Sequence, residues 1–243
     1  MITRASIIRL LCVVALACGL QGVTASVASA CDSPNKDHCY GRVFWAKSAT
    51  GATDTINVDC LHSPTGDPDR FITSELWVQR ETSSLYWTEE GMVFGGPWFS
   101  DPFQRRWFWA DHRPADDPGQ VNVHPAPSAG DNLNQDYKIG ISQNDDAPSQ
   151  WFVRQDGDQV GVSTQQFSAA ANELVAGSET SANISRTQMH AKALQWRGSQ
   201  GDWNDGWEDN DSHAQKDNVG TGYATDWVNQ FGHFTVDRNE GDC

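Results

Sequence analysis

Basic residues are scarce in this chain, which has 17 Lys and Arg against 32 Asp and Glu and a formal net charge of −15. An acidic surface repels nucleic-acid phosphates, so nucleic acid is excluded as a class of partner. At about pH 4 many of these carboxylates would be neutral, and the repulsion between them would fall. The charge is therefore compatible with a protein that works in acid.

Long apolar runs are absent beyond the first residues. The stretch Ile7 to Leu20 follows a basic start and precedes Ala28-Ser29-Ala30, which has the small-residue pattern of a cleavage site. It is too short to span a bilayer. We expect residues 1–30 to be a secretory signal peptide and residues 31–243 to form one secreted, extracellular, monomeric domain that contacts no membrane. A lipid anchor on Cys31 is the alternative, although small and polar residues separate this cysteine from the apolar stretch.

Cysteines are also few, because Cys12 and Cys18 fall within the expected signal peptide. The remaining four are Cys31, Cys39, Cys60 and Cys243. An even number in an exported chain predicts two disulfides with three possible pairings. Cys39 and Cys60 lie in neighbouring strand-like runs that could pair as a hairpin, and Cys31 and Cys243 are the two ends of the mature chain. The sequence therefore favours Cys39–Cys60 and Cys31–Cys243. Zinc thiolates are disfavoured, since there is no CxxC.

Helical periodicity is almost absent, apart from a hint at Ser168–Asn172. Alternating runs predict about eleven strands: Cys39–Trp45, Thr53–Cys60, Phe71–Arg80, Tyr86–Phe94, Arg105–Asp111, Tyr137–Gln143, Gln150–Gln155, Gln159–Val162, Glu173–Thr180, Gln188–Trp196 and Phe231–Asp237. The strongest hairpin signal is Asp156-Gly157-Asp158. Hairpin turns without a βαβ rhythm predict an all-β fold, a jelly-roll or concanavalin-like sandwich of two antiparallel sheets.

Motifs for metal and serine catalysis are missing as well. There is no HExxH, no HxxxH and no GxSxG. The segment Gly198–Gly222 is rich in Asp, Asn and Gly and is expected to be a long surface loop. Its acidic part, Asp202 to Asp211, could hold calcium through oxygen ligands, but it does not fit the twelve-residue calcium loop, and a solvated loop is favoured. No metal and no organic cofactor are expected.

Two short matched patterns carry the candidate chemistry: Trp87-Thr88-Glu89-Glu90-Gly91 and Ala176-Gly177-Ser178-Glu179. Each places a glutamate two residues from a glycine within a strand, so the two side chains share a face. A glycine there leaves a gap in which a ligand can approach. Two such glutamates on one sheet would form the carboxylate pair used in acid–base hydrolysis. Two solvated glutamates on half-exposed strands are the alternative.

Tryptophan is abundant, with 11 residues, all in the expected mature chain. Trp107, Trp109 and Asp111 share one face of a predicted strand. Exposed aromatic rings on a concave sheet bind sugars by stacking, which suggests a carbohydrate cleft. The alternative is that most of these rings fill the core of the sandwich.

Several motifs resemble a family of small secreted β-sandwich proteins from filamentous soil bacteria, mostly of unassigned function. These motifs are His38-Cys39-Tyr40-Gly41, Ser74-Glu75-Leu76-Trp77-Val78, Tyr86-Trp87-Thr88-Glu89, Phe108-Trp109-Ala110-Asp111-His112-Arg113-Pro114 and Leu194-Gln195-Trp196. The resemblance extends over nearly the whole mature chain.

More remotely, the order of motifs is similar to that of the neprosin-type glutamic peptidases, which are jelly-roll sandwiches with two catalytic glutamates. Glu89 with Gly91 matches the first glutamate of that family, and Gly177-Ser178-Glu179 stands where it has Gly-Gly-Glu. Trp109-Ala110-Asp111 matches its Trp-x-Asp strand. This chain departs from the pattern at Met92, where the family has an aromatic residue, and at Ser178.

That resemblance implies an acid-acting endopeptidase in which Glu89 and Glu179 share a proton and activate water. Trp87, Trp109 and Asp111 would bind an extracellular polypeptide, and Gln79 or Gln195 would help to hold the oxyanion. Two other classes stay open. A glycosidase or polysaccharide lyase would use the same carboxylates on a polysaccharide, whereas a non-catalytic carbohydrate-binding module would need only the tryptophans.

Overall fold

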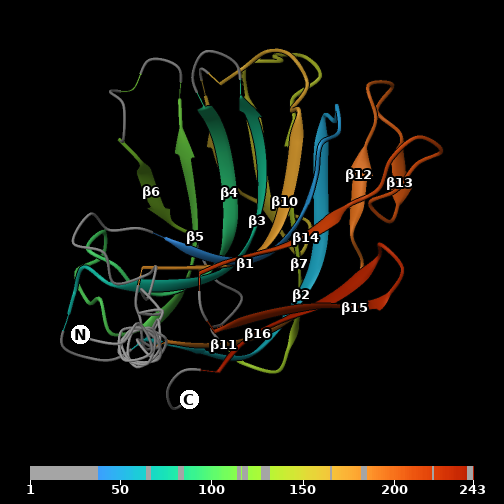
Figure 1. Ribbon diagram of the computed structural model, residues 1–243. Helices are drawn as coiled ribbons and strands as arrows, with labels where there is room; N and C mark the ends of the chain where they lie inside the picture. The colour runs from blue at the N-terminus through green and yellow to red at the C-terminus, as the bar shows by residue number, and fades with distance from the viewer. Residues whose placement is uncertain are drawn as a thin grey trace, which may run out of the picture.

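The computed structural model describes residues 38–63, 67–81, 85–113, 116, 120–126, 132–164, 166–181, 185–220, 222–239 and 243. The expected signal peptide and Cys31 lie outside this part of the chain. The described residues form an all-β sandwich of two antiparallel sheets (Figure 1), as the alternating patterns predicted. None of them forms a helix that is long and apolar enough to cross a bilayer.

The first sheet has seven strands and carries the candidate glutamates. Their spatial order is β14 (Gln215–Val219), β1 (Cys39–Trp45), β10 (Glu173–Thr180), β3 (Phe71–Glu81), β4 (Leu85–Gly95), β5 (Arg105–His112) and β6 (Asn122–Pro125). Figure 1 shows β10, β3, β4 and β5 side by side in this sheet. Strands that are far apart in the sequence therefore become neighbours at its centre.

The second sheet has nine strands. The main path is β15 (Tyr223–Asn229), β16 (His233–Asn239), β11 (Arg186–Ala191), β2 (Gly51–His62), β7 (Asp136–Gln143), β8 (Trp151–Gln155) and β9 (Asp158–Ser163). Beside it, β12 (Gln195–Arg197) pairs with β2 and with β13 (Trp203–Asp205). The β12–β13 pair stands at one end of the molecule in Figure 1.

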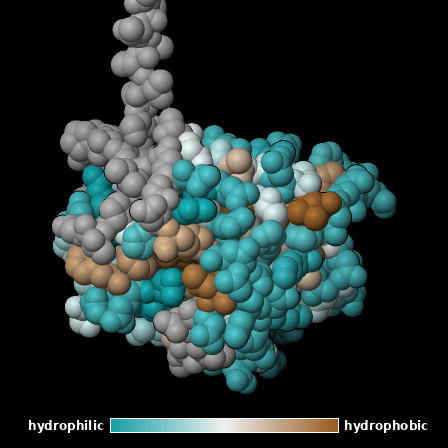
Figure 2. Space-filling view, turned by 90° about the horizontal axis from the view of Figure 1, so that it is seen from below, coloured by the Kyte–Doolittle hydropathy of each residue, from teal (hydrophilic) through white to brown (hydrophobic). Residues whose placement is uncertain are grey.

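The core lies between the sheets, where alternate side chains of both sheets meet. The inner face of the seven-stranded sheet contributes Ile72, Leu76, Met92 and Trp107, and the nine-stranded sheet contributes Ile56, Ile139, Ile141 and Trp151. All eight are at most 1 % exposed. Several of the tryptophan side chains are thus buried and contribute to packing, but Trp203 remains 43 % exposed. The face in Figure 2 is mostly hydrophilic, with only scattered hydrophobic residues.

One buried carboxyl crosses the core and joins the two sheets. Glu90 points inward from β4, is 0 % exposed, and accepts a hydrogen bond of 3.0 Å from the backbone N–H of Gly140 on β7. Burial raises its pKa well above the ordinary value. A buried carboxyl in this position is expected to be neutral in acid, where it costs the least free energy.

The strand count differs from the predicted eleven, because the described residues form sixteen strands. The predicted strand Gln188–Trp196 is divided between β11 and β12. The expected surface loop Gly198–Gly222 contains β13 and β14, and β14 pairs with β1 along five residues. Its sequence, QKDNV, is polar and mostly exposed at the edge of the sheet, so no alternation of apolar residues marks it.

The predicted hairpin between β8 and β9 is confirmed. Asp156 and Gly157 both have positive φ, 51° and 91°, as a two-residue hairpin turn with the right twist requires. Glycine adopts this conformation without a steric cost, and Asp is among the few other residues that tolerate it.

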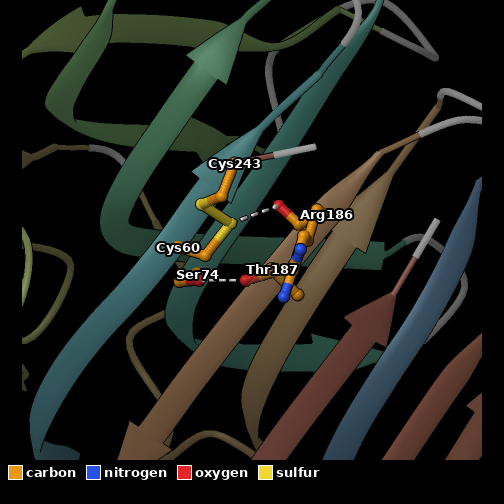
Figure 3. Close-up of a disulfide and its surroundings, with 5 residues drawn as sticks. All are labelled: Cys60, Ser74, Arg186, Thr187 and Cys243. Carbon is orange, nitrogen blue, oxygen red and sulfur yellow. Dashed lines mark hydrogen bonds between the residues drawn. A yellow bond between two sulfur atoms is a disulfide. The ribbon is translucent and has the colours of Figure 1, made fainter. Parts of the chain in front are cut away.

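The predicted disulfide pairing is wrong. Cys60 is bonded to Cys243, with 5.9 Å between the Cα atoms, and Cys39 is bonded to another cysteine. Figure 3 shows this bridge beside the Arg186 backbone, whose carbonyl oxygen lies 3.9 Å from the Cys60 sulfur. The predicted Cys39–Cys60 and Cys31–Cys243 pairs fail because β1 and β2 belong to different sheets rather than to one hairpin.

The bridge ties the C-terminus to β2 across a sequence separation of 183 residues. We therefore expect Cys243→Ser to lower the free energy of unfolding by about 2–5 kcal/mol. Thermal unfolding of Cys243→Ser, Cys60→Ser and the double variant measures this effect, and the double variant should lose no more than either single one. Peptide mapping of the unreduced protein should link Cys60 to Cys243. A Cys39–Cys60 peptide would contradict this pairing.

Candidate active site

The register of three strands brings the predicted glutamates to one face and places a third between them. Glu75 on β3 lies opposite Gly91 on β4 and opposite Gly177 on β10. Glu89 is two residues from Gly91 on one side, and Glu179 is two residues from Gly177 on the other. Such diagonal neighbours on a sheet are about 7–8 Å apart, which is within reach of long side chains. All three glutamates lie on the outer face of the seven-stranded sheet.

The two glycines of the sequence patterns have a different role from the expected one. A Cβ atom on Gly91 would lie 2.5 Å from the Cβ of Glu75, and one on Gly177 would lie 2.3 Å from the carbonyl oxygen of Gly41. The space that was expected to admit a ligand is thus occupied by the protein itself. Both glycines let neighbouring strands and the Glu75 side chain pack closely at the centre of the site.

Glu75 is the most enclosed of the three carboxyls, at 1 % exposure. Its Oε1 accepts a hydrogen bond of 2.5 Å from the hydroxyl of Thr73, while its buried Oε2 has no hydrogen-bond partner. Burial raises the pKa of Glu75 well above the ordinary value, and the nearby charges of Glu89 and Glu179 raise it further. A protonated Glu75 would carry an O–H donor on the oxygen that is otherwise unpartnered.

Glu89 is partly exposed and lies opposite Trp77 on β3. Burial raises its pKa well above the ordinary value, and the charge of Glu179 raises it further. A hydrogen bond from the Trp77 side chain acts in the opposite direction. Because two carboxylates close together cannot both ionise cheaply, Glu89 is expected to hold a proton in acid.

Glu179 is held from the side of β1. Its side chain is 12 % exposed, and its Oε1 contacts Nδ1 of His38. Its backbone N–H donates to the Thr73 hydroxyl at 3.0 Å, so Thr73 contacts both Glu75 and Glu179. Tyr40 is its partner across β1 and β10. Burial, followed by the charge of Glu179, raises the pKa of Tyr40 above its ordinary range, so the phenol stays protonated and can donate.

An apolar wall adjoins the carboxyls on the same outer face. It consists of Phe71, Val93, Phe108 and Ala110, packed against Trp87, Phe99 and Val123. This wall lowers the local polarity, which strengthens the mutual effect of the carboxyls. The predicted residue Trp87 belongs to it.

The other predicted site residues separate into two groups. Gln79 shares the outer face, where its Nε2 donates to Glu173 at 2.6 Å. Gln195 lies on β12 of the other sheet and donates to Asp205, so the structure does not bring it to the glutamates.

Trp109 and Asp111 also lie away from the glutamate face, because they point inward with Trp107. Trp109 is stacked on His124, with 3.9 Å between the ring centroids, and it fills the space above Gly161. Asp111 accepts a hydrogen bond from Ser163 and is 2 % exposed. Both residues contribute to the packing between the sheets.

The sequence did not single out Glu75, Trp77, Thr73, Tyr40 or His38 as functional. A partial signal existed, since alternation along Phe71–Arg80 places Glu75, Trp77 and Gln79 on one face. The pairing of β3 with both β4 and β10 was the missing information. The expected acidic loop is held by its own contacts, in which Asp209 pairs with Lys47 and accepts from the N–H of Ser212. Within the described residues, no three His, Cys, Asp or Glu side chains gather to hold a metal ion.

Comparison with known proteins supports the fold class. Two solved structures of scytalido-glutamic peptidase, each with a transition-state analog, share the fold with TM-scores of 0.54 and 0.53. SCP-B, a member of the eqolisin family of peptidases in a complex with the tripeptide Ala-Ile-His, gives 0.51. Each is 10 % identical in sequence, and the match covers 83 % of this chain and 98 % of the other. No protein-family profile and no curated protein matches the chain. These three structural neighbours are peptidases, and the likeness shows that this chain shares their fold.

The buried carboxyls make stability depend on pH. Their folded-state pKa values lie above the unfolded ones, so the folded protein binds more protons, and stability falls as pH rises above about 4. Asp54 extends the pH range over which stability falls up to about pH 7, because burial raises its pKa to about 7. Asp116 and Asp136 have lowered pKa values, so their protonation changes the stability of the fold only below about pH 4.

We therefore expect the melting temperature to decrease between about pH 4 and pH 7. Glu75→Gln and Asp54→Asn should each reduce this decrease, because a neutral amide cannot ionise, and their effects should add, since the residues lie in different sheets. Thermal unfolding followed by circular dichroism across this range measures the effect. The exposed Glu81→Gln is the control and should follow the wild type. A melting temperature that rises toward pH 7 would show that these carboxyls are ionised in the folded protein.

Proposed function

We propose that the protein is a secreted glutamic endopeptidase that hydrolyses extracellular polypeptides in acid, with Glu89 and Glu179 as its catalytic carboxyls. The observation that carries this proposal is the cluster of three glutamates on one sheet face beside an apolar wall. The sandwich shared with glutamic peptidases supports it at the level of the fold. Strongly perturbed carboxyls in one place are typical of hydrolytic sites.

The two carboxyls have different surroundings, which suggests different roles. Glu89 has a raised pKa and holds the proton. Glu179 instead contacts Nδ1 of the His38 imidazole. Glu179 therefore takes a proton from water, and the water oxygen bonds to the carbonyl carbon of the substrate.

The protonated Glu89 donates a hydrogen bond to the carbonyl oxygen while negative charge develops there. When the C–N bond breaks, Glu89 gives its proton to the leaving nitrogen. The proton that came from water stays on Glu179, so the pair again holds one proton and returns to its starting state by exchange. The two residues act as a unit, and their titration belongs to the pair.

The remaining outer-face residues supply binding and support. Trp87, which is partly exposed and packs against the buried apolar wall, offers a surface for apolar side chains of the polypeptide. Gln79 lies next to Trp77 on the same face, and its amide is a donor for the oxyanion. Glu75, neutral and fixed by Thr73, keeps the space between the two catalytic carboxyls free of a third charge.

The test is hydrolysis of an unfolded protein substrate by the mature chain. We expect activity at about pH 4 and little at pH 7, because one carboxyl must keep its proton. Glu89→Gln and Glu179→Gln should each reduce kcat by at least about 10³-fold, and the double variant should be no worse than either one, because the pair acts as a unit.

Glu90→Gln is the matched control, since its side chain points into the core, and it should stay active. Full activity in Glu179→Gln would exclude the pair. Cleavage of a polysaccharide without proteolysis at any pH would assign the same carboxyls to glycosidic chemistry instead.

Glu75→Gln separates the support role from a catalytic one. A glutamine is neutral at every pH, so this variant should keep activity in acid but lose it at lower pH than the wild type, because an ionised neighbour no longer helps Glu89 to keep its proton. The pH profile of kcat/KM measures the shift. If Glu75→Gln abolishes activity while Glu89→Gln does not, the catalytic pair is Glu75 with Glu179.

A further inference from the structure

The nine-stranded sheet carries a concave site on its own outer face, on the opposite side of the sandwich from the glutamates. This groove has a volume of about 590 Å³. Its floor is formed by Thr53 on β2, Gly140 on β7 and Arg154 on β8, which lie side by side in the sheet register. Ser142 and Phe152 form the next row. The proposed peptidase site uses none of these residues.

Basic residues outnumber acidic ones in this groove by three to two, the acidic ones being Asp145 and Asp146, although the chain as a whole is strongly acidic. Three of the 17 basic residues, Lys138, Arg154 and Arg197, line it. Arg197 is paired with Asp145 through two hydrogen bonds of 3.0 and 2.6 Å. In the part of the chain that the structure describes, Lys138 and Arg154 have no carboxylate partner. Two cations therefore remain available to a negatively charged ligand.

Arg154 is fixed in position before any ligand arrives. Its Nη1 donates to the hydroxyl of Ser142 at 2.7 Å, and its guanidinium lies 4.7 Å from the centre of the Phe152 ring. These contacts use one of five N–H donors and leave the others for an acceptor. A held guanidinium loses little conformational entropy on binding, which favours recognition of a carboxylate.

The rest of the lining fits a sugar chain better than a peptide. Trp203 on β13 is 43 % exposed and offers a flat ring for stacking against a sugar. Hydroxyl and amide groups of Thr53, Gln143, Asn144 and Gln195 can meet sugar hydroxyls. The groove runs over a sheet face rather than along an edge, so it offers a peptide no backbone ladder.

We propose that this groove binds an anionic polysaccharide, in which carboxylates on the sugar rings contact Lys138 and Arg154 and a ring stacks on Trp203. The site tethers the protein to an acidic polysaccharide while the glutamate face, on the other side of the sandwich, stays open. The proposal stands independently of the peptidase reaction, because no residue is shared.

Binding of polygalacturonate to the mature chain, measured by calorimetry at about pH 5 where sugar carboxylates are ionised, tests the proposal. Its fully methyl-esterified form has the same rings without charge and should bind at least about tenfold more weakly. Lys138→Gln and Arg154→Gln should each weaken binding of polygalacturonate about three- to tenfold. Trp203→Ala should weaken binding of both forms.

The control is Lys216→Gln, which removes the same charge outside the groove and should bind like the wild type. Equal weakening in Lys216→Gln and Lys138→Gln would show that the attraction comes from charge in general and would overturn the proposal. Equal binding of the ester and the acid would overturn the role of the two cations. Tighter binding of poly-glutamate than of polygalacturonate would mean that the groove takes acidic polypeptides instead. No binding of polygalacturonate would also overturn it.

Discussion

The candidate site depends on the register of β3 between β4 and β10. In this register Glu75 lies opposite Gly91 on β4 and opposite Gly177 on β10. Glu89 and Glu179 are each two residues from one of these glycines, on the same outer face of the sheet. A shift of one residue in β3 would turn its outer-face side chains, Glu75 and Trp77 included, into the core, because side chains alternate along a strand. The apolar inner face, with Ile72, Leu76 and Val78, fixes that register through burial. Core packing thus determines which polar groups meet outside.

Burial of carboxyls is the second constraint, and it reaches beyond the site. Glu75, Glu90 and Asp54 are each at most 1 % exposed, and they lie in different parts of the sandwich. Among the described residues, no cation lies near enough to any of the three to offset the loss of hydration, so folding favours the neutral form of each. The fold is therefore most stable at acidic pH, where buried carboxyls are protonated, and this is also the pH range in which an acid-acting carboxylate pair would keep its shared proton.

Much of the sheet structure could be predicted from the sequence. Alternation identified β1 to β5, β7 to β11 and β16 but not β15, and it showed that Glu89 and Glu90 point to opposite faces. Asp156-Gly157 marked its hairpin. Short polar edge strands such as β14 were not predicted, because they bury little apolar surface and carry no periodic pattern.

Long-range pairing was beyond the sequence. The proximity of Glu75 to the two predicted glutamates requires β3 to pair with β10, about a hundred residues further along the chain. The same lack of information on long-range strand pairing explains the wrong disulfide prediction, since the cysteine that bonds to Cys60 depends on which sheet β2 joins. It also explains Trp109 and Asp111, whose strand was predicted correctly but whose buried face was taken for the cleft.

The likeness to glutamic peptidases at 10 % identity shows the sandwich and leaves the chemistry to individual side chains. On that criterion the two outer faces differ in kind. The seven-stranded sheet concentrates acids in apolar surroundings, where protons are held, whereas the nine-stranded sheet concentrates cations among hydroxyls, amides and an exposed indole. A small local excess of cations on the face away from the glutamates lets a strongly acidic protein offer Lys138 and Arg154 to an anionic ligand, without placing these cations beside the carboxyls of the glutamate face. Separation by the full thickness of the core is what makes the two compatible, because exposed charges further apart than about 10 Å are largely screened in salt.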